Sequence, residues 1–270
     1  MSTVSVPPSA QVSGQILLRH DQDGVATLTL NRPNQYNALS EEMLRELQSA
    51  LENIEQDDCV RVVVIAGNGP AFCAGHDLKQ MRATPRKDYY EKLFAQCSQM
   101  MMTLTRIPQP VIARVHGIAT AAGCQLVAQC DLSVASENAK FAVSGINVGL
   151  FCSTPSVPLG RNVLRKQAME MLLTGDFIDA RTAKERGLVN AVAPLEDLDT
   201  AVADLARRIK SKSAVAVATG KKMFYKQMEM GLEGAYRYAA ETMACNMMAE
   251  DAAEGIDAFM QKRPPEWKGK

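Results

Sequence analysis

The 270-residue sequence has no net charge and no long apolar run, and each absence excludes a class of protein. Thirty Lys and Arg balance thirty Asp and Glu, so bulk charge gives no basis for binding nucleic acid. A local basic patch for an anionic ligand stays open. No apolar stretch approaches the roughly 20 residues that a membrane-spanning helix needs. The N-terminus lacks a basic segment followed by an apolar one, and its first arginine is Arg19. We therefore expect neither a secretory signal nor a mitochondrial presequence.

Cysteine pairs at redox or zinc spacing are also missing. The seven cysteines are odd in number and mostly lie in apolar runs, with no CxxC pair and no Cys/His cluster. We expect reduced, mostly buried thiols, no metal site, and a soluble protein of the cytoplasm. What is present is an ordinary globular composition, 47% hydrophobic and 22% charged, which fits one or two domains.

Short apolar runs separated by helical patterns predict a layered α/β core. Two such runs flank the turn Asp23-Gly24 and predict a hairpin. Residues 60–67 and 110–117 are apolar and end in glycine, a pattern typical of strands buried on both faces. Residues 131–136 repeat it more weakly. Strands of this kind joined by helices imply crossover connections, which fits such a layered core.

After residue 160 the pattern changes from strands to helices. We expect helices over 165–175, 179–187, 196–210, 214–228, 232–249 and 251–262. The chain then divides into a loose tail (1–14), an α/β core (15–200) and a helical C-terminal region (201–270) of the same functional unit. Methionines crowd these last helices, which favours adaptable packing at a subunit interface; they are Met223, Met228, Met230, Met243, Met247 and Met248.

Two loops after predicted buried strands carry the strongest chemical signal. In residues 67–79, glycine and proline end the strand, and Ala74–Asp77 come directly before a predicted helix. Residues 116–131 place small residues, Ala119 to Gly123, before an apolar helix. Both loops put approachable backbone N–H groups just past strand ends, where α/β sheets bind ligands. Two convergent donors are what an oxyanion hole requires. Small residues that merely allow tight packing are the alternative for either loop alone.

Five motifs in the same order resemble the enoyl-CoA hydratase/isomerase (crotonase) superfamily. They are NRPNQYNALS (31–40), AFCAGHDLKQM (71–81), RIPQPVIARVHGIATAAGCQL (106–126), AMEMLLTGDFIDARTAKERGLVN (168–190) and EGIDAFMQKR (254–263). The resemblance implies a ClpP-like spiral of ββα units with a C-terminal helical trimerisation region, assembled as a homotrimer or a dimer of trimers. It also implies an acyl-CoA thioester as partner, with coenzyme A entering as part of the substrate and no permanently bound cofactor.

The same resemblance assigns residues to a site. It implies that the backbone N–H groups of His76 and Ala122 hold the thioester enolate. Lys79 and Lys262 stand at positions that resemble CoA-contacting lysines, the second reaching a neighbouring subunit; solvated surface lysines are the alternative. The other residues ascribed to substrate binding lie in the two loops: Ala74, Asp77, Ala121 and Gly123. Asp77 would support the first loop by capping the helix that follows.

The chain departs from the hydratase pattern at both catalytic positions. Hydratases that it resembles use two glutamates to deliver water and its proton, and here the matching positions are Gln125 and Gly145. Neither residue can exchange a proton near neutral pH, so ordinary hydration is not supported. Restoring both carboxylates would test whether the pocket is inherited. The acidic or tyrosine residues of the isomerase, dehalogenase and decarboxylase branches are also missing, at Gly145, Cys152 and Ser153.

Four side chains near the expected thioester remain as candidates, each with an alternative. His76 has an ordinary pKa near neutrality, yet could serve only through its N–H. Cys152 is a nucleophile if a neighbour lowers its pKa, and otherwise a small buried apolar residue. Gln125 either hydrogen-bonds the thioester, an acyl substituent or a water, or completes a buried polar network. Ser153 favours a turn, since no base partner is identifiable. His116 is expected to be structural.

Two functions from different classes follow. The leading hypothesis is an acyl-CoA thioester enzyme of fatty acid metabolism, within the hydratase, isomerase, lyase and thioesterase set. The alternative is a non-catalytic protein of the same fold that binds CoA thioesters and acts by sequestration. The acyl group and the reaction stay open.

Overall fold

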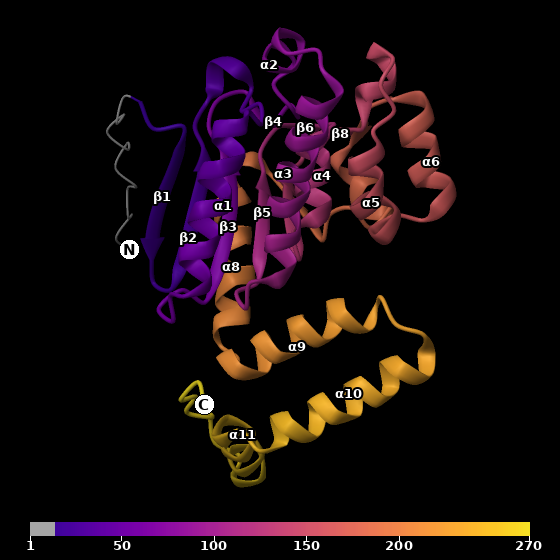
Figure 1. The fold of residues 1–270 in the computed structure, drawn as a ribbon. Helices are drawn as coiled ribbons and strands as arrows, with labels where there is room; N and C mark the ends of the chain where they lie inside the picture. Colours follow the sequence, from indigo (N-terminus) through magenta and orange to yellow (C-terminus); the bar gives the residue numbers. More distant parts are fainter. Residues whose placement is uncertain (1–13) are drawn as a thin grey trace.

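The computed structural model describes residues 14–270, which form two sheets, flanking helices and a helical arm (Figure 1). The predicted loose tail therefore lies outside the described residues, apart from Gly14. The six-stranded sheet consists, in spatial order, of β1 (Leu17–Gln22), β2 (Val25–Leu30), β3 (Val62–Gly67), β5 (Val111–Val115), β7 (Leu132–Ser136) and β10 (Ala191–Ala193). The four-stranded sheet consists of β4 (Ala71–Cys73), β6 (Ile118–Thr120), β8 (Lys140–Ala142) and β9 (Ile178–Asp179).

The helices surround these sheets and then continue into the arm. Those before the arm are α1 (Glu41–Glu55), α2 (Leu78–Ala83), α3 (Lys87–Arg106), α4 (Ala122–Gln129), α5 (Ser153–Asn162), α6 (Arg165–Thr174), α7 (Ala180–Glu185) and α8 (Leu198–Lys210). The arm consists of α9 (Ala214–Gln227), α10 (Leu232–Met247) and α11 (Glu250–Gln261). Three short 3-10 turns are η1 (Pro33–Gln35), η2 (Ser144–Val148) and η3 (Leu195–Asp197).

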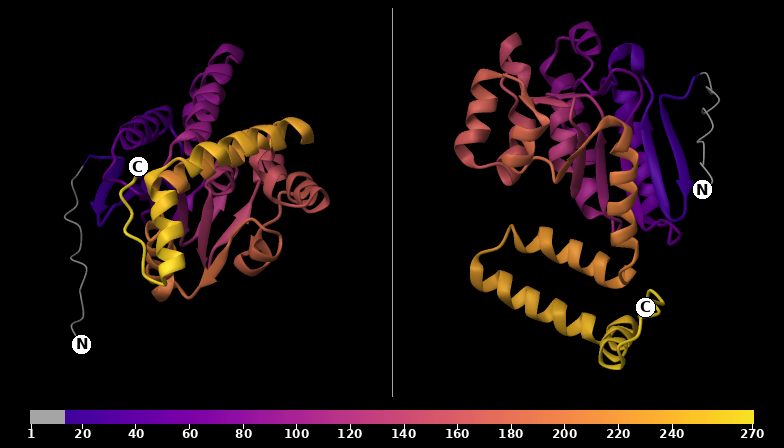
Figure 2. Two further views of the ribbon diagram at one scale, coloured as in Figure 1. Left: turned by 90° about the horizontal axis from the view of Figure 1, so that it is seen from below. Right: turned by 180° about the vertical axis from the view of Figure 1, so that it is seen from behind.

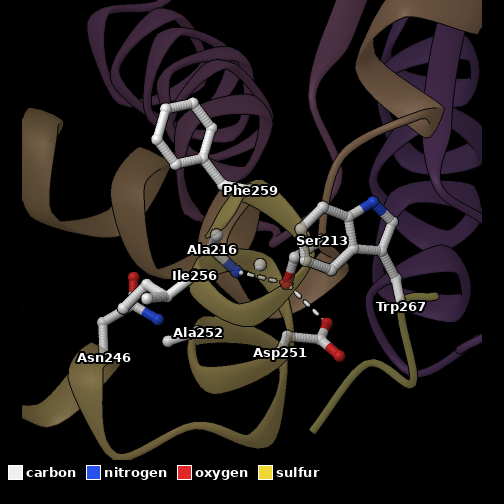
Figure 3. Close-up of a pocket in the computed structure, with 9 residues that line it drawn as sticks. Ser213, Ala216, Asn246, Asp251, Ala252, Ile256, Phe259 and Trp267 are labelled. Carbon is white, nitrogen blue, oxygen red and sulfur yellow. Dashed lines mark hydrogen bonds between the residues drawn. The ribbon is translucent and has the colours of Figure 1, made fainter. Parts of the chain in front are cut away.

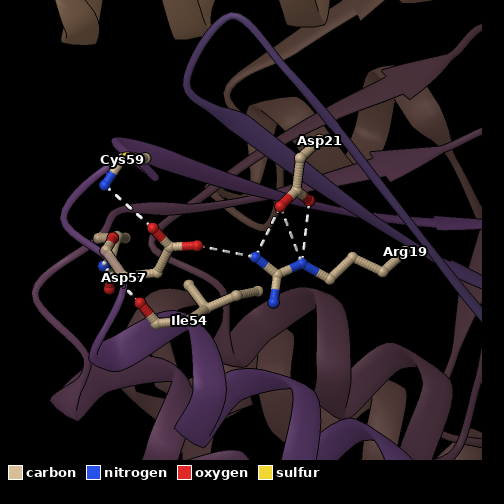
Figure 4. Close-up of polar contacts among 6 residues, drawn as sticks. Arg19, Asp21, Ile54, Asp57 and Cys59 are labelled. Atoms are coloured by element: carbon tan, nitrogen blue, oxygen red, sulfur yellow. Dashed lines mark hydrogen bonds and ion pairs between the residues drawn. The ribbon is translucent and has the colours of Figure 1, made fainter.

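The predicted hairpin is confirmed. β1 and β2 pair antiparallel around Asp23 and Gly24, whose positive φ angles of 49° and 73° suit a two-residue turn between twisted strands. On the surface of the hairpin, Arg19 forms ion pairs with Asp21 at 2.6 Å and with Asp57 at 3.1 Å (Figure 4). These contacts fasten the edge strand to the turn that follows α1.

The central strand β3 is buried on both faces, as its apolar run predicted. All six of its residues are buried. Because side chains alternate along a strand, Val63 and Ile65 join the core formed with α1 and α3, whereas Val62 and Val64 pack against α8. The six-stranded sheet therefore lies between helices on both sides.

Three successive pairs of strands have the same arrangement, with the first strand in the large sheet and the second in the small sheet. β3 runs in the large sheet and β4 in the small one, and the pairs β5–β6 and β7–β8 do the same, each followed by helices. Strands β3, β5, β7 and β10 pair parallel to one another, as crossover connections require. The expected spiral of ββα units is thereby confirmed. Because each unit of the spiral lies beside the one before it, β4, β6 and β8 are neighbours in the small sheet and the loops that follow them lie close together.

The predicted C-terminal helices are also confirmed, and no strand occurs between Leu198 and the C-terminus. The boundary expected near residue 200 falls inside α8, whose buried Leu198, Val202 and Ala206 pack on the large sheet. Helices α9 to α11 instead stand away from the sheets as an arm (Figure 2). Among residues 14–270, no helix is both long and apolar enough to cross a membrane.

A buried ion pair attaches the arm to the core. The Lys221 ammonium of α9 donates to Asp131 at 2.7 Å and to the carbonyl oxygens of Leu104 and Gln109 at 2.7 and 2.8 Å. The hydroxyl of Tyr225 donates to the other oxygen of Asp131 at 2.8 Å, and burial raises the pKa of this phenol. Side chains of Lys221 and Asp131 are only 6% and 13% exposed, so the pair is largely shielded from water.

A second polar anchor closes the arm on itself. Asp251 of α11 is buried and accepts hydrogen bonds from the Ser213 hydroxyl at 2.6 Å and from the Lys268 N–H at 2.7 Å. Figure 3 shows Asp251 and Ser213 beside Trp267, at a cavity of about 320 Å³. The last residues of the chain are thereby tied to the start of α9.

Candidate active site

The first candidate donor lies in the turn between β4 and α2. Leu39 pairs with this turn, since its N–H donates to the Gly75 carbonyl at 2.7 Å and its carbonyl accepts from the Asp77 N–H at 3.3 Å. In such a parallel bridge the middle residue, His76, directs its own N–H to the opposite side. The His76 N–H donates to no backbone acceptor within residues 14–270 and is left for a ligand.

The second candidate donor is the first residue of α4. Ala122 is buried, and the N-cap before it, Ala121, provides no side-chain acceptor. First-turn N–H groups have no partner inside their own helix, and Ala122 donates to no other backbone acceptor in the described chain. The positive end of the helix dipole lies at the same point. Negative charge on a ligand would therefore be stabilised beside Ala122.

The two loops are in direct contact. A methyl group built on Gly75, whose φ is +93°, would lie 2.9 Å from the Ala121 Cβ and 3.1 Å from the Ala122 nitrogen. Gly123 is packed still more tightly, because a methyl group there would lie 2.0 Å from the Cys73 carbonyl oxygen. The glycines therefore allow the His76 and Ala122 turns to approach each other and β4.

Ala121 has a backbone conformation that an L-residue rarely adopts, with φ 50° and ψ −120°. Such a conformation costs on the order of 1–3 kcal/mol, and glycine, which has no Cβ, avoids most of that cost. Ala121→Gly should therefore stabilise the fold by about 1 kcal/mol after the entropy of the unfolded chain is included. Thermal denaturation should show a rise in Tm of about 2–4 °C; a lowered Tm would show that Ala121 is unstrained.

Asp77 holds the first loop, as its predicted capping role requires. Its side chain accepts from the N–H groups of Lys79 and Gln80 at 3.1 and 3.2 Å, and pairs with the Arg32 guanidinium at 3.1 Å. Burial by itself would raise the pKa of Asp77, but these donors together hold the pKa below its usual value. The prediction that Asp77 is a helix cap is confirmed.

Asp77→Asn should weaken the fold by about 1 kcal/mol at pH 7, because asparagine still caps the helix but cannot pair with Arg32. A depressed carboxyl pKa contributes stability above the ordinary value of about 3.9, and this contribution is lost as the pH falls through the depressed pKa. Denaturant titrations of both proteins should therefore differ at pH 7 and still differ at pH 4, and should converge only as the pH falls through the depressed pKa of Asp77. A constant difference across this range would exclude the charge as the cause.

The imidazole of His76 is largely enclosed. Its ring packs edge-on against Phe94 with centroids 5.5 Å apart, and both ring nitrogens are buried without a hydrogen-bond partner. Burial lowers the pKa of His76, so the ring is neutral at physiological pH and offers one donor and one acceptor.

Gln125 lies one helical turn after Ala122 and is only 4% exposed. Its Oε1 is buried and has no hydrogen-bond partner. The alternative in which Gln125 completes a buried polar network therefore leaves this oxygen unexplained.

At Gly145, the position of the second glutamate, neighbouring atoms leave no space for a side chain. A Cβ on Gly145 would lie 2.4 Å from the Leu150 carbonyl oxygen and 2.8 Å from the Cys152 Sγ. Leu150 and Gly145 are also joined by a 3.0 Å hydrogen bond. A Gly145→Glu substitution would have to displace this loop, so restoring both carboxylates is not a clean test of the pocket.

The seven cysteine thiols form no disulfide in the structure, and most of them pack in the interior. All seven cysteines are free and five are buried, as predicted. The Sγ of Cys152 accepts from the Gly145 N–H at 3.3 Å, and burial raises its pKa; burial also raises the pKa of Cys124 to about 12. Cys152 is therefore a neutral thiol, which does not favour a nucleophile. No group of three or more His, Cys, Asp or Glu in the described chain is placed to hold a metal ion.

Several remaining residues take no part in this cluster. Ser153 is the first residue of α5, and its hydroxyl approaches only the Phe151 carbonyl, at 3.4 Å. The Nε2 of His116 bonds the Gly69 carbonyl at 2.8 Å, in keeping with its expected structural role. Lys79 is exposed on α2, whereas Lys262 ends α11 at the opposite end of the molecule (Figure 1). The structure does not bring these two lysines together.

The sequence did not predict one hydrogen-bonded pair of side chains near the two loops, Thr120 and Ser144. The hydroxyls of Thr120 and Ser144 are hydrogen-bonded at 2.7 Å and join the end of β6 to η2, directly before Ala121 and Gly145. Neither residue stands in an unusual sequence pattern, so only the pairing of β6 with β8 reveals them. A cavity of about 1070 Å³ lies elsewhere, between α9 and the core.

Known proteins share both the sequence and the fold. The family model for enoyl-CoA hydratase/isomerase matches residues 20–270. Enoyl-CoA hydratase domain-containing protein 3 of Mus musculus is 44% identical over 261 residues, covering 97% of this chain and 87% of that protein. The crystal structure of the human protein of that name has 44% identity and a TM-score of 0.91, covering 94% of this chain and 100% of that one. An enoyl-CoA hydratase structure from Mycobacterium smegmatis has 58% identity and a TM-score of 0.92, covering 94% and 99%. The chain therefore belongs to the enoyl-CoA hydratase/isomerase family, as its five motifs predicted.

Proposed function

We propose that the protein is an enzyme that binds an acyl-CoA thioester and stabilises the enolate of its acyl group between the N–H groups of His76 and Ala122. The observation that carries this proposal is that both N–H groups lack a backbone acceptor on loops that touch at Gly75. Fixed donors aimed at a developing negative oxygen need no reorganisation during the reaction, and one such donor contributes a factor of about 100 to 1,000 in rate. Coenzyme A would enter as part of the substrate, without another cofactor.

Ordinary hydration is not the reaction we propose. Gln125 cannot act as a base, and the loop at Gly145 leaves no room for a second carboxylate. His76 carries a titratable side chain and also provides one of the two N–H donors. Its buried, neutral ring can exchange a proton with the substrate only if the acyl group lies within hydrogen-bonding distance of it. The reaction belongs to the remaining chemistry of a thioester at two N–H donors, which includes isomerisation and carbon–carbon lysis through an enolate, and thioester cleavage through a tetrahedral oxyanion.

Mass spectrometry of the purified protein with a panel of CoA thioesters tests this proposal. The panel contains short and long enoyl, malonyl-type, aromatic and saturated acyl groups. Loss of carbon dioxide, release of free CoA or a new isomer separated by chromatography would each identify the reaction class, whereas gain of water would contradict the exclusion of ordinary hydration. Absence of both turnover and binding across the panel would contradict the proposal.

A second candidate is a CoA-thioester-binding protein without catalysis. The loss of both glutamate positions favours it, since the usual route of proton transfer is gone. Binding of thioesters with neither a change in mass nor a new isomer on chromatography, after many hours with the protein, would favour this second function over the first.

The arm is proposed to hold copies of the chain together, as a trimer or a dimer of trimers. No apolar residue of α9 or α10 is buried, and helices are seldom stable in water without a packed apolar face. Large apolar side chains that the arm exposes are Phe224, Met228, Leu232, Tyr236, Met243, Met247, Met248, Ile256, Phe259 and Met260. Light scattering should give three or six times 29.4 kDa; a monomer at micromolar concentration would contradict the proposal.

The compartment also remains a proposal. The vertebrate relatives are named as mitochondrial proteins, whereas the sequence leads us to propose the cytoplasm for this chain. Fractionation of cells that express the full chain would decide between the two.

A further inference from the structure

We infer that Lys221 and Tyr225 of the arm are positioning residues for the site. By holding Asp131 at the C-terminal end of α4, they fix the Ala122 N–H at the other end of that helix. This inference rests on the proposed function, because it assumes that the Ala122 N–H contacts the thioester oxygen. It goes further in making the geometry of the site depend on the attachment of the arm, so that loosening the arm lowers the rate.

Asp131 is the residue at which the arm and α4 meet. It directly follows Cys130, the C-cap of α4. Its Oδ1 accepts from the Tyr225 hydroxyl at 2.8 Å, and its Oδ2 accepts from the Lys221 ammonium and from the Val111 N–H, both at 2.7 Å. Hydrogen bonds to an ionised carboxylate are about twice as strong as those between neutral groups. The arm therefore supplies strong contacts that fix where α4 ends.

The helix α4 is short and enclosed. Its 8 residues, at about 1.5 Å each, make it about 12 Å long, and each of them except Gln129 is buried. The carbonyl oxygen of Ala128 in the last turn accepts from the Asn162 side chain at 2.9 Å. Close-packed interiors transmit a displacement rather than absorb it. A shift at the Asp131 end would therefore move α4 as one body.

The N-terminal end of α4 has no space for such a shift. A methyl group on Gly123 would lie 2.0 Å from the Cys73 carbonyl oxygen, and one on Gly75 would lie 3.1 Å from the Ala122 nitrogen. The helix thus touches β4 and the turn that carries His76. Donors stabilise an oxyanion only within about 2.7–3.1 Å of it. A displacement of α4 by a few tenths of an ångström would therefore weaken the pair of donors.

The same ammonium also contacts α3, which supports the other donor turn. Lys221 donates to the Leu104 carbonyl oxygen, in the last turn of α3, at 2.7 Å. Further along α3, Phe94 packs edge-on against the His76 ring. The arm therefore holds the C-terminal ends of two helices, each of which contacts one of the donor turns.

Infrared spectroscopy of bound butyryl-CoA, labelled with carbon-13 at the thioester carbonyl, tests the inference on the full chain. Tyr225→Phe removes one hydroxyl from Asp131 and keeps both the ring and the ion pair, so the fold should persist. We expect its carbonyl stretching frequency to return part of the way from the wild-type value to the value in water. For the thioester that the panel identifies, kcat should fall about 3- to 10-fold while KM stays within about twofold.

Tyr236→Phe is the matched control, because it makes the same change at an arm residue that is 71% exposed. It should keep the wild-type frequency. An unchanged frequency in Tyr225→Phe, whatever its Tm, would overturn the inference, since the contact would then stabilise the fold without setting the donors. An equal shift in both variants would also overturn it, because the effect would not depend on Asp131. A wild-type frequency no lower than in water would instead contradict the proposed function on which the inference rests.

Discussion

Turnover of the thioester should fall about 100- to 1,000-fold when Ala122 is replaced by proline in an Ala121→Gly background. Ala122 is the first residue of α4, a position where proline is well tolerated because no helical hydrogen bond is lost, and proline replaces the N–H with a ring methylene. The Ala121→Gly background is needed because proline clashes with the Cβ of the residue before it. Affinity for the substrate should fall less than the rate, since the oxyanion forms only during the reaction.

The single variant Ala121→Gly is the control for this prediction, and it should retain the wild-type rate. Circular dichroism and Tm of the double variant should match those of the single variant, which separates a lost donor from a lost fold. An unchanged rate in the double variant would mean that the Ala122 N–H does not contact the reacting oxygen.

Loss of the buried cation at Lys221 should strongly destabilise the fold. Lys221→Met removes the partner of Asp131 and leaves the carbonyl oxygens of Leu104 and Gln109 without their donor. Breaking a buried pair from one side typically costs about 3–5 kcal/mol, so Tm should fall by roughly 10 °C. The arm should also become accessible to proteases, because this cation joins α9 to the core.

Lys222→Met is the matched control, since the neighbouring Lys222 is exposed. Its free energy of unfolding should stay within about 0.5 kcal/mol of the wild type. A similar loss of stability in both variants would show that the buried position of Lys221 is not the cause. A loss below about 1 kcal/mol at Lys221 would show that the pair contributes only what an exposed ion pair does.

Local patterns predicted most of the fold, because long elements leave strong signals. The buried strand β3 lies within the apolar run 60–67, and the helix predicted over 165–175 ends at the left-handed Gly175. The strands β4, β6 and β8 have three residues each, which is too short for a period to show. Their sheet nevertheless holds both candidate loops together.

The sequence predicted the two loops of the site, but not the packing around Gly145 and Gln125. Small residues around Gly75 and Ala122 indicated approachable backbone, and resemblance to the family assigned their roles. That Gly145 has no room for a side chain depends on the Leu150 carbonyl oxygen, five residues away, which no spacing rule predicts. The unpaired oxygen of Gln125 is likewise a property of packing among several elements.

Isotope-edited infrared spectroscopy of bound butyryl-CoA tests the central claim most directly. The thioester carbonyl would be labelled with carbon-13, and its stretching frequency compared in water, on the wild type and on the Ala121→Gly/Ala122→Pro variant. Hydrogen bonds from the His76 and Ala122 N–H groups should lower the frequency on the wild type, and loss of one donor should return it part of the way. A carbonyl frequency on the wild type no lower than in water would contradict the account.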